Sequence, residues 1–264
     1  MRIDYQTLRI EGAAEHVLLV TLNRPEVANA FNTQMGRDLL EFWTGMIAEP
    51  GKTRAVVLTG AGTRAFCAGG DLKERNGMTR TQWEAQHEIF ERQYWALLDC
   101  PVPVIAAVNG HAYAGGCEKV LACDFAYAVP NARFALTEVT LGIMPGAGGT
   151  QLLPRAVGER RAKEIILTGK PFSAEEALRW GLVNRLCAPE TLIQEALETA
   201  NAIAANAPLS VRQAKKSIHL GLQMDLRSAL RFEIEAYNRL IPTKDRDEGI
   251  RAFNEKRKPV FRGE

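Results

Sequence analysis

The sequence lacks any long uninterrupted apolar run, and this shortage limits the kinds of protein it can encode. Its most apolar stretch, residues 102–116, is broken by Asn109, Gly110 and His111, so it does not reach the length of a membrane-spanning helix. The opening residues MRIDYQTLRIEG lack the basic start and apolar run of a secretory signal. We therefore expect a cytoplasmic protein with no membrane partner.

Cysteine and histidine are also scarce. The cysteines number five, an odd count without paired short spacings, so no disulfide framework is implied and each is expected to be a small buried side chain. The four histidines show no metal-ligand spacing with Cys, Asp or Glu, so no metal site is expected. These residues are Cys67, Cys100, Cys117, Cys123 and Cys187, with His16, His87, His111 and His219.

Positive and negative charges almost balance over the whole chain, but they are unevenly distributed. The chain of 264 residues is 46% hydrophobic and 24% charged, with a net charge of +2, which fits one large globular α/β domain with an appendage. Residues 208–264 contain 13 basic and 8 acidic side chains, typical of a solvated helical surface or of a phosphate-binding one; the solvated surface is favoured. No basic and aromatic stripe is present, so no nucleic-acid partner is expected.

Strand and helix patterns alternate through the first part of the chain, and only helical patterns follow Pro189. The predicted strands are residues 17–24, 54–60, 103–110 and 124–129. The predicted helices are 29–48, 81–98 and 115–122, then 190–206, 208–220, 226–240 and 243–256. This order predicts an α/β core followed by a helical segment.

Two glycine-rich stretches resemble nucleotide-binding motifs, but their surroundings do not fit. TGAGTRA places Gly60, Gly62 and Ala65 in a G-x-G-x-x-A pattern, so a nicotinamide-dependent dehydrogenase is an alternative. A second strand-like piece and another glycine turn follow where a long helix should begin. The stretch MPGAGGTQ lacks the lysine of a phosphate-binding loop, and no G-x-S-x-G motif occurs. These glycines are better interpreted as turn residues.

Two other glycine pairs each precede a predicted helix, in AFCAGGD and NGHAYAGGCE. A helix start offers N–H groups without internal partners, and glycine allows a ligand to approach the main chain. Gly70 and Gly115 could therefore hold a developing oxyanion together, although either pair alone is more often a simple turn.

Two glutamates have apolar or small neighbours, which is unusual for this residue type. Glu118 lies in GGCEKVLA, and Glu138 follows RFALT. Partial burial raises the pKa of a carboxyl toward neutrality, which suits proton exchange with carbon or water. The sequence thus favours acid–base chemistry.

In this order and spacing, AFCAGGDLKE, VNGHAYAGGCE and ALTEVTLGIMPGAGGTQ resemble the crotonase, or enoyl-CoA hydratase/isomerase, family. The resemblance begins at VTLNRPEVANAFN and extends to FNEKRKPVF. It implies an α/β fold in which residues 1–195 form a spiral of repeated β-β-α units with an acyl-CoA site. Residues 196–264 would form a helical trimerisation segment, giving a homotrimer or a dimer of trimers.

The resemblance also implies roles for the candidate residues in adding water to a 2-enoyl-CoA thioester. The N–H groups of Gly70 and Gly115 would bind the thioester oxygen. Glu138 would give a proton to the α-carbon, and Glu118 would help hold and activate the water. The backbone of Gly146 would line the water's site. No cofactor is implied, because coenzyme A is part of the substrate.

Seven positions match the family's contacts with coenzyme A. Five lie in two N-terminal loops and would clasp the adenine and pantetheine. Two lie near the C-terminus and would complete the nucleotide pocket across a subunit boundary, which makes the basic C-terminus a possible phosphate partner. They are Val27, Ala28, Ala68, Leu72 and Lys73, with Phe253 and Lys256.

Three residues depart from the family pattern around the first glutamate. Ala114 replaces a usual glycine, Tyr113 a usual aliphatic residue, and Lys119 a usual apolar residue. Because adjacent helical residues diverge by about 100°, we interpret Lys119 as pointing away from the site, as a cation on the subunit surface.

Several functions stay open at this stage. A double-bond isomerase needs chiefly Glu138, whereas retention of Glu118 favours a hydratase. The segment DLKERNGMT is similar to a segment of hydratases that act on branched, methylglutaconyl-type enoyl-CoA. A non-catalytic acyl-CoA-binding or RNA-binding protein of the same fold is the alternative from another class.

Overall fold

The computed structural model describes residues 4–264, and its centre is a six-stranded sheet. The strand order is β1-β2-β3-β5-β7-β10, parallel except for the antiparallel hairpin of β1 and β2. The strands are β1 (Leu8–Ala14), β2 (Val17–Leu22), β3 (Ala55–Gly60), β5 (Val104–Val108), β7 (Phe125–Ala128) and β10 (Arg185–Leu186).

A second sheet of four short strands lies beside the first, in the order β4-β6-β8-β9. Three times in succession the chain enters the large sheet with one strand and the small sheet with the next: β3 then β4, β5 then β6, and β7 then β8. The predicted repetition of β-β-α units is therefore confirmed. The small strands are β4 (Ala65–Cys67), β6 (His111–Tyr113), β8 (Arg133–Ala135) and β9 (Phe172–Ser173).

The burial of the central parallel strands agrees with their composition. Every residue of β3 and of β5 is buried, as expected where helices cover both faces of a parallel sheet. The predicted strands at 17–24, 54–60, 103–110 and 124–129 correspond to β2, β3, β5 and β7. Of the small sheet, only β4 was indicated, by the strand-like piece at Phe66 and Cys67; the other strands were not predicted, because segments of two or three residues show no clear periodicity.

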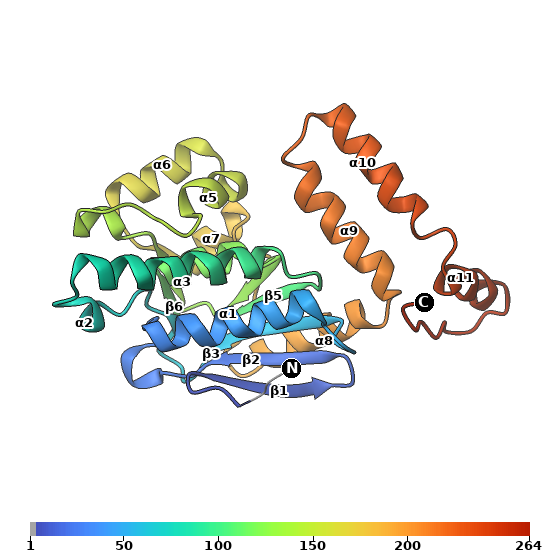
Figure 1. The fold of residues 1–264 in the computed structure, drawn as a ribbon, viewed down its shortest axis with the longest axis horizontal. Coiled ribbons are helices and arrows are strands. Elements are labelled where there is room, and N and C mark those ends of the chain that lie inside the picture. The colour runs from blue at the N-terminus through green and yellow to red at the C-terminus, as the bar shows by residue number, and fades with distance from the viewer. Residues whose placement is uncertain (1–3) are drawn as a thin grey trace.

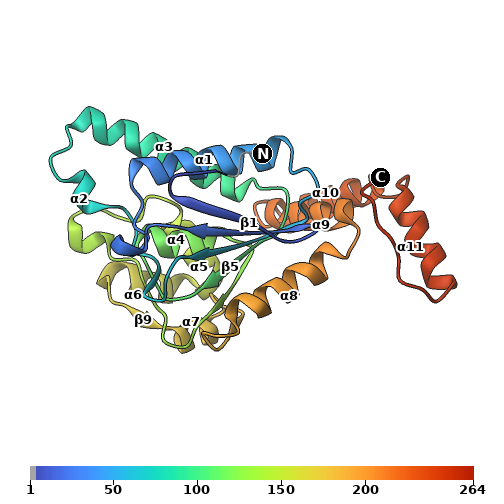
Figure 2. The ribbon, with the colours of Figure 1, turned by 90° about the horizontal axis from the view of Figure 1, so that it is seen from below.

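Helices α1 (Thr33–Ala48) and α3 (Arg80–Leu98) lie on one side of the large sheet, and α8 (Leu192–Ala204) lies on the other (Figure 2). The N-terminus of α1 is capped by the Asn32 side chain, which accepts from Met35 N at 2.9 Å. At the start of α3, Thr79 and Gln82 form a capping box. Side-chain caps of this kind satisfy N–H groups that the helix leaves unpaired.

Short helices connect successive strands of the two sheets. Glu118 lies within one of them, α4, and Glu138 begins another, η2. These elements are η1 (Pro25–Val27), α2 (Leu72–Arg75), α4 (Gly115–Ala122), η2 (Glu138–Leu141), α5 (Gly149–Val157), α6 (Glu159–Thr168) and α7 (Ala174–Trp180).

The last three helices extend away from the α/β core (Figure 1). They are α9 (Pro208–Gly221), α10 (Leu226–Asn238) and α11 (Lys244–Asn254), which confirms the helices predicted there. Lys215 anchors α9 to the core by donating to the carboxylate of Asp124 at 2.7 Å and to Val102 O at 2.9 Å. The predicted boundary between residues 195 and 196 falls inside α8, and residues 1–3 lie outside the described part, so that division stays a prediction.

The cysteines and Gly60 are the next features that the fold explains. All five cysteines are free and buried. Gly60 ends β3, and β4 begins at Ala65, so no helix starts where a dinucleotide-binding turn requires one. A Cβ at Gly60 would lie 2.5 Å from Phe66 O, which explains the glycine by close backbone packing. Within residues 4–264, no helix is long and apolar enough to cross a membrane.

Candidate active site

A cavity of about 450 Å³ lies between α3, α4 and the loops that follow β4 and β8. It brings together predicted residues that are far apart in the sequence. Among the residues lining it are Ala68, Gly70, Leu72, Gly115, Glu118, Glu138 and Gly146. Each predicted acid–base and oxyanion group thus contacts one enclosed space.

The two proposed oxyanion donors lie on adjacent loops. Phe31 N donates to Gly69 O at 2.7 Å and Asp71 N donates to Phe31 O at 2.8 Å, so this parallel bridge leaves the N–H of Gly70 directed away from it. Gly115 is the first residue of α4, and its N–H has no acceptor within the helix. A Cβ built at Gly69 would lie only 3.3 Å from Gly115 N, which places the loops in close contact.

Ala114 provides the bend that presents Gly115. Its backbone has φ 49° and ψ −125°, a conformation that normally requires glycine and costs other residues about 1–3 kcal/mol. Its N–H donates to Ala135 O at 2.8 Å, which helps hold the bend. Ala114 stands where the family resemblance predicts glycine. The unusual backbone conformation therefore forms here with alanine in place of glycine.

Glu118 is buried and held by the main chain. Its Oε1 accepts hydrogen bonds from Ala147 N and Gly149 N, both at 2.8 Å. Burial raises the pKa of this carboxyl, while the two backbone donors oppose that shift. The second carboxylate oxygen remains available for a reacting water.

Glu138 begins η2 and is 6% exposed. Its Oε2 is buried and lacks a hydrogen-bond partner within the described residues. Burial raises the pKa of Glu138 to about 7, with a smaller contribution from the nearby Glu118. A carboxyl with this pKa exchanges protons readily at neutral pH.

Lys119 contradicts the interpretation from the sequence. It was expected on the subunit surface, but it is 1% exposed and lines the cavity. Its Nζ donates to Gln93 Oε1 at 2.7 Å. The divergence of about 100° from Glu118 directs this side chain toward α3, because α4 is enclosed and has no solvent-facing side at this position.

Other cavity residues were not identified from the sequence. Arg75 from α2 and the α3 residues Trp83, His87 and Tyr94 also line the cavity. The Tyr94 hydroxyl is buried with no hydrogen-bond partner in residues 4–264. Trp83 stacks on His87 with ring centroids 4.8 Å apart. Their four-residue spacing indicated one helix face, but nothing in the sequence showed that this face borders the site.

The residues predicted to contact coenzyme A are dispersed. Ala68 N donates to Ala28 O at 3.0 Å, so the two N-terminal loops lie side by side, and Leu72 is 54% exposed at the cavity. Phe253 is 83% exposed on α11, and α11 lies at the opposite end of the molecule from α2 (Figure 1). The remaining three are Val27 in η1, Lys73 in α2, and Lys256 just after α11.

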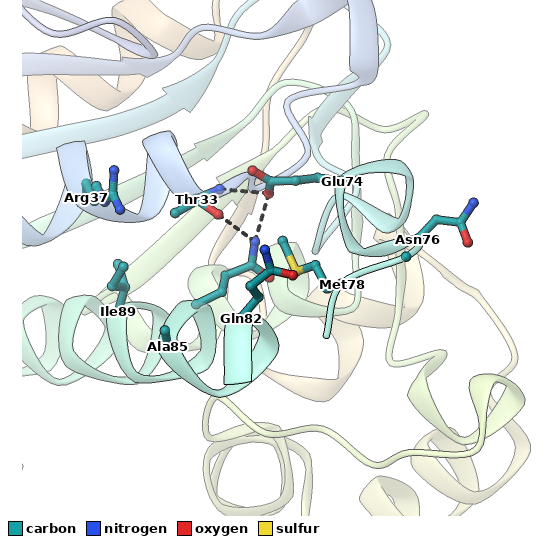
Figure 3. A pocket seen from close by; sticks show the side chains of 10 residues that line it. Thr33, Arg37, Glu74, Asn76, Met78, Gln82, Ala85 and Ile89 are labelled. Carbon is teal, nitrogen blue, oxygen red and sulfur yellow. Dashed lines mark hydrogen bonds between the residues drawn. The ribbon is translucent and has the colours of Figure 1, made fainter. Parts of the chain in front are cut away.

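A second hollow, between α1, α2 and α3, is lined on one side by a hydrogen-bond network (Figure 3). Glu74 accepts from Thr33 N at 2.8 Å and from Gln86 Nε2 at 2.7 Å. Gln86 Oε1 in turn accepts from Arg75 Nε at 2.9 Å. The network ties the wall of the first cavity to α1, and we interpret it as structural.

Metal binding is not supported by the arrangement of ligands. In the part of the chain that the structure describes, no group of three or more His, Cys, Asp or Glu side chains could hold a metal ion. What the cavity does bring together is two carboxyls, Glu118 and Glu138, and the backbone of Gly70 and Gly115.

Comparison with known proteins gives consistent matches over almost the whole chain. A family model described as enoyl-CoA hydratase/isomerase matches residues 12–264. The short-chain-enoyl-CoA hydratase of Clostridium acetobutylicum is 43% identical over 258 residues, covering 98% of this chain and 97% of that protein. The (E)-benzylidenesuccinyl-CoA hydratase of Thauera aromatica is 41% identical over 255 residues, covering 95% and 97%.

Comparison with solved structures agrees with the comparison of sequences. The crystal structure of an enoyl-CoA hydratase from Bacillus anthracis matches with a TM-score of 0.96 and 46% identity, covering 98% of this chain and 100% of that chain. The likeness therefore includes both the α/β core and the C-terminal helices.

Proposed function

The chain belongs to the enoyl-CoA hydratase/isomerase family, and we propose that Glu118 and Glu138 carry out its reaction, the reversible addition of water to a 2-enoyl-CoA thioester. Glu118, ionised and held by two backbone N–H groups, accepts a proton from water as the water oxygen bonds to the β-carbon. Electrons move toward the thioester oxygen, and protonated Glu138 delivers a proton to the α-carbon. No further cofactor enters this step.

The oxyanion is stabilised by the N–H groups of Gly70 and Gly115. Negative charge grows on the thioester oxygen during attack, and fixed donors in a water-excluded cavity interact most strongly with that developing charge. The backbone at Gly146 borders the same space and would help confine the water.

The presence of two buried carboxyls in one cavity carries the proposal. An isomerase moves a proton between carbons and needs chiefly one shuttling group, whereas hydration also needs a group that orients water. Glu118 supplies the second group, and the unpartnered Oε2 of Glu138 is free to act on carbon. The geometry therefore supports hydration over isomerisation or simple ligand binding.

The direct test is the loss of absorbance of the conjugated thioester when crotonyl-CoA is added to purified protein. We expect rapid loss without added metal or nicotinamide, and a 3-hydroxyacyl-CoA product by mass spectrometry. A product of unchanged mass would indicate isomerisation, and binding without conversion would indicate a non-catalytic protein. Either result would overturn the hydratase proposal.

Coenzyme A would approach along the neighbouring loops that contain Val27, Ala28, Ala68, Leu72 and Lys73. Support comes from the backbone contact between the two loops and from their position beside the cavity. Phe253 lies on α11 and Lys256 follows it, and α11 is at the opposite end of the molecule from α2, whose Leu72 lines the cavity (Figure 1). Both residues would instead complete the site of a neighbouring subunit. Separately, the cytoplasmic location of the protein stays a prediction.

Self-association would use the apolar face of α10. Leu226, Leu230 and Ile234 recur every four residues and are 75%, 52% and 56% exposed, a pattern that marks an uncovered helix face. We expect the protein to sediment as a trimer or a dimer of trimers. The double substitution Leu230→Lys and Ile234→Lys should yield monomers, because it places charges in the buried interface.

Leu167→Lys is the matched control, since Leu167 is 72% exposed on α6, away from α10. It should leave the sedimentation unchanged. A wild-type protein that is monomeric at micromolar concentration would overturn the assembly and the cross-subunit roles of Phe253 and Lys256, without affecting the roles of the glutamates.

A further inference from the structure

A buried lysine in the wall of the cavity lacks an opposite charge. Lys119 Nζ donates to the neutral Oε1 of Gln93 and lies 5.1 Å from the centroid of the Phe31 ring. Within residues 4–264, no carboxylate forms an ion pair with it. An ammonium has three donors, and burying its charge without a paired anion is costly.

The groups near Lys119 do not fully offset the burial of its charge. Burial lowers the pKa of Lys119 to about 8, against the opposing influence of Cys123, Cys67 and Glu118. The carboxylate of Glu118 is already held by two backbone N–H groups and is required for chemistry in the proposed reaction. The cavity therefore contains a cation that a bound ligand could neutralise.

Arg75 is a second, only partly buried cation that lines the same cavity. Its Nε donates to the neutral Gln86 Oε1, and its Cζ lies 5.4 Å from the centroid of the Phe90 ring. Burial lowers the pKa of Arg75 despite the nearby Glu74. The orphaned hydroxyl of Tyr94 is a third donor in the cavity wall. Three unsatisfied or weakly paired donors indicate a ligand with acceptor oxygens.

We propose that the acyl group of the natural substrate carries a second carboxylate, and that Lys119 is the specificity-determining residue that binds it. The inference rests on the proposed hydratase function, because the same cavity must hold the acyl chain. A carboxylate supplies the missing charge and accepts charge-assisted hydrogen bonds from the ammonium, with Arg75 or Tyr94 able to donate as well. A purely hydrocarbon chain would leave the buried ammonium of Lys119 against apolar atoms.

The test compares thioesters that differ only at the far end of the acyl chain. Glutaconyl-CoA and hex-2-enedioyl-CoA end in a carboxylate, and 2-pentenoyl-CoA and 2-hexenoyl-CoA end in a methyl group. In the wild type, kcat/KM should be higher for an acid than for its methyl partner. Lys119→Met should lower that preference at least about 30-fold, because removing one member of a buried charge pair leaves the other unpaired.

Lys163→Met, at an exposed position on α6, is the matched control and should leave the preference unchanged. Equal losses for acids and methyl partners in Lys119→Met would indicate a structural role and overturn the inference. So would a wild type that hydrates the methyl partners as well as, or better than, both acids. If no thioester, crotonyl-CoA included, is hydrated, the proposed function itself fails.

Competition measurements on the wild type keep the inference testable if Lys119→Met does not fold. Glutaryl-CoA and pentanoyl-CoA are saturated, so they bind without reacting. Glutaryl-CoA should inhibit hydration of crotonyl-CoA at a concentration at least 10-fold lower than pentanoyl-CoA. Equal inhibition constants would contradict recognition of a carboxylate.

Discussion

Glu138→Gln is expected to lower kcat for hydration by roughly 10²–10⁴-fold, the range for loss of a general acid–base group. Glutamine preserves the volume and leaves acyl-CoA binding largely intact, but it cannot deliver a proton to the α-carbon. Glu118→Gln should cause a loss of the same order. Its amide oxygen can still accept from Ala147 and Gly149, so the loop geometry should survive. Steady-state kinetics with crotonyl-CoA measure both effects.

Glu190→Gln, at an exposed position, is the matched control and should retain full activity. If either cavity variant turned over crotonyl-CoA at close to the normal rate, its glutamate would have no role in proton transfer. Binding of a saturated acyl-CoA separates a catalytic defect from loss of the site.

Thermal melting gives an independent check on Glu138. Burial raises its pKa from 4.5 to about 7, so between these pH values the folded protein binds more protons than the unfolded chain. Wild-type stability should therefore decrease as pH rises through this window. Glutamine does not titrate, so the Tm of Glu138→Gln relative to wild type should increase from pH 4.5 to pH 7.

Gly115→Pro should lower kcat by roughly 10²–10³-fold, the effect of removing one oxyanion donor, equivalent to about 2.7–4 kcal/mol. Proline lacks the N–H that would bind the thioester oxygen. Position 115 is the first residue of α4, where proline is well tolerated because that N–H has no partner in the helix. Proline also disfavours the backbone of Ala114 before it, at φ 49° and ψ −125°, so the fold of the variant must be verified before the loss of kcat is assigned to chemistry.

Gly115→Ala is the matched control, because alanine keeps the N–H. Its Cβ would lie 3.4 Å from the Phe31 ring, an ordinary contact, so a much smaller loss is expected. Native-like circular dichroism and melting temperature must accompany the proline variant. A folded Gly115→Pro protein with near-normal turnover would show that the glycine pair is only a turn.

The sequence predicted four of the six strands of the large sheet, missing β1 and β10, and it predicted the last helices, for different physical reasons. Segments such as β3 and β5 are short, fully buried and almost entirely apolar, as is typical of buried parallel strands. Helix α9 begins at Pro208, which is favoured in the first turn of a helix. Most of the small sheet was missed because segments of two or three residues carry no period, and its strands pair with distant parts of the chain.

The site was predictable where local chemistry identifies it and not where packing does. Gly70, Gly115, Glu118 and Glu138 stand in distinctive surroundings, and the structure places them on one cavity. Lys119 was misplaced because helical angle alone does not show whether a helix has a solvent side. Recognising α4 as enclosed requires the elements around it, which come from distant parts of the chain.

The order of strands in the small sheet has a consequence for how this enzyme can change. Gly70, Gly115 and Glu138 each come shortly after one of its parallel strands, β4, β6 and β8 respectively. Neighbouring strands are about 4.8 Å apart whatever their side chains, so the spacing of the reacting groups is inherited from main-chain hydrogen bonding. Side chains around the acyl group can then be substituted while the spacing of the reacting groups stays the same. New substrates can therefore be acquired without a change in the main-chain framework of the site.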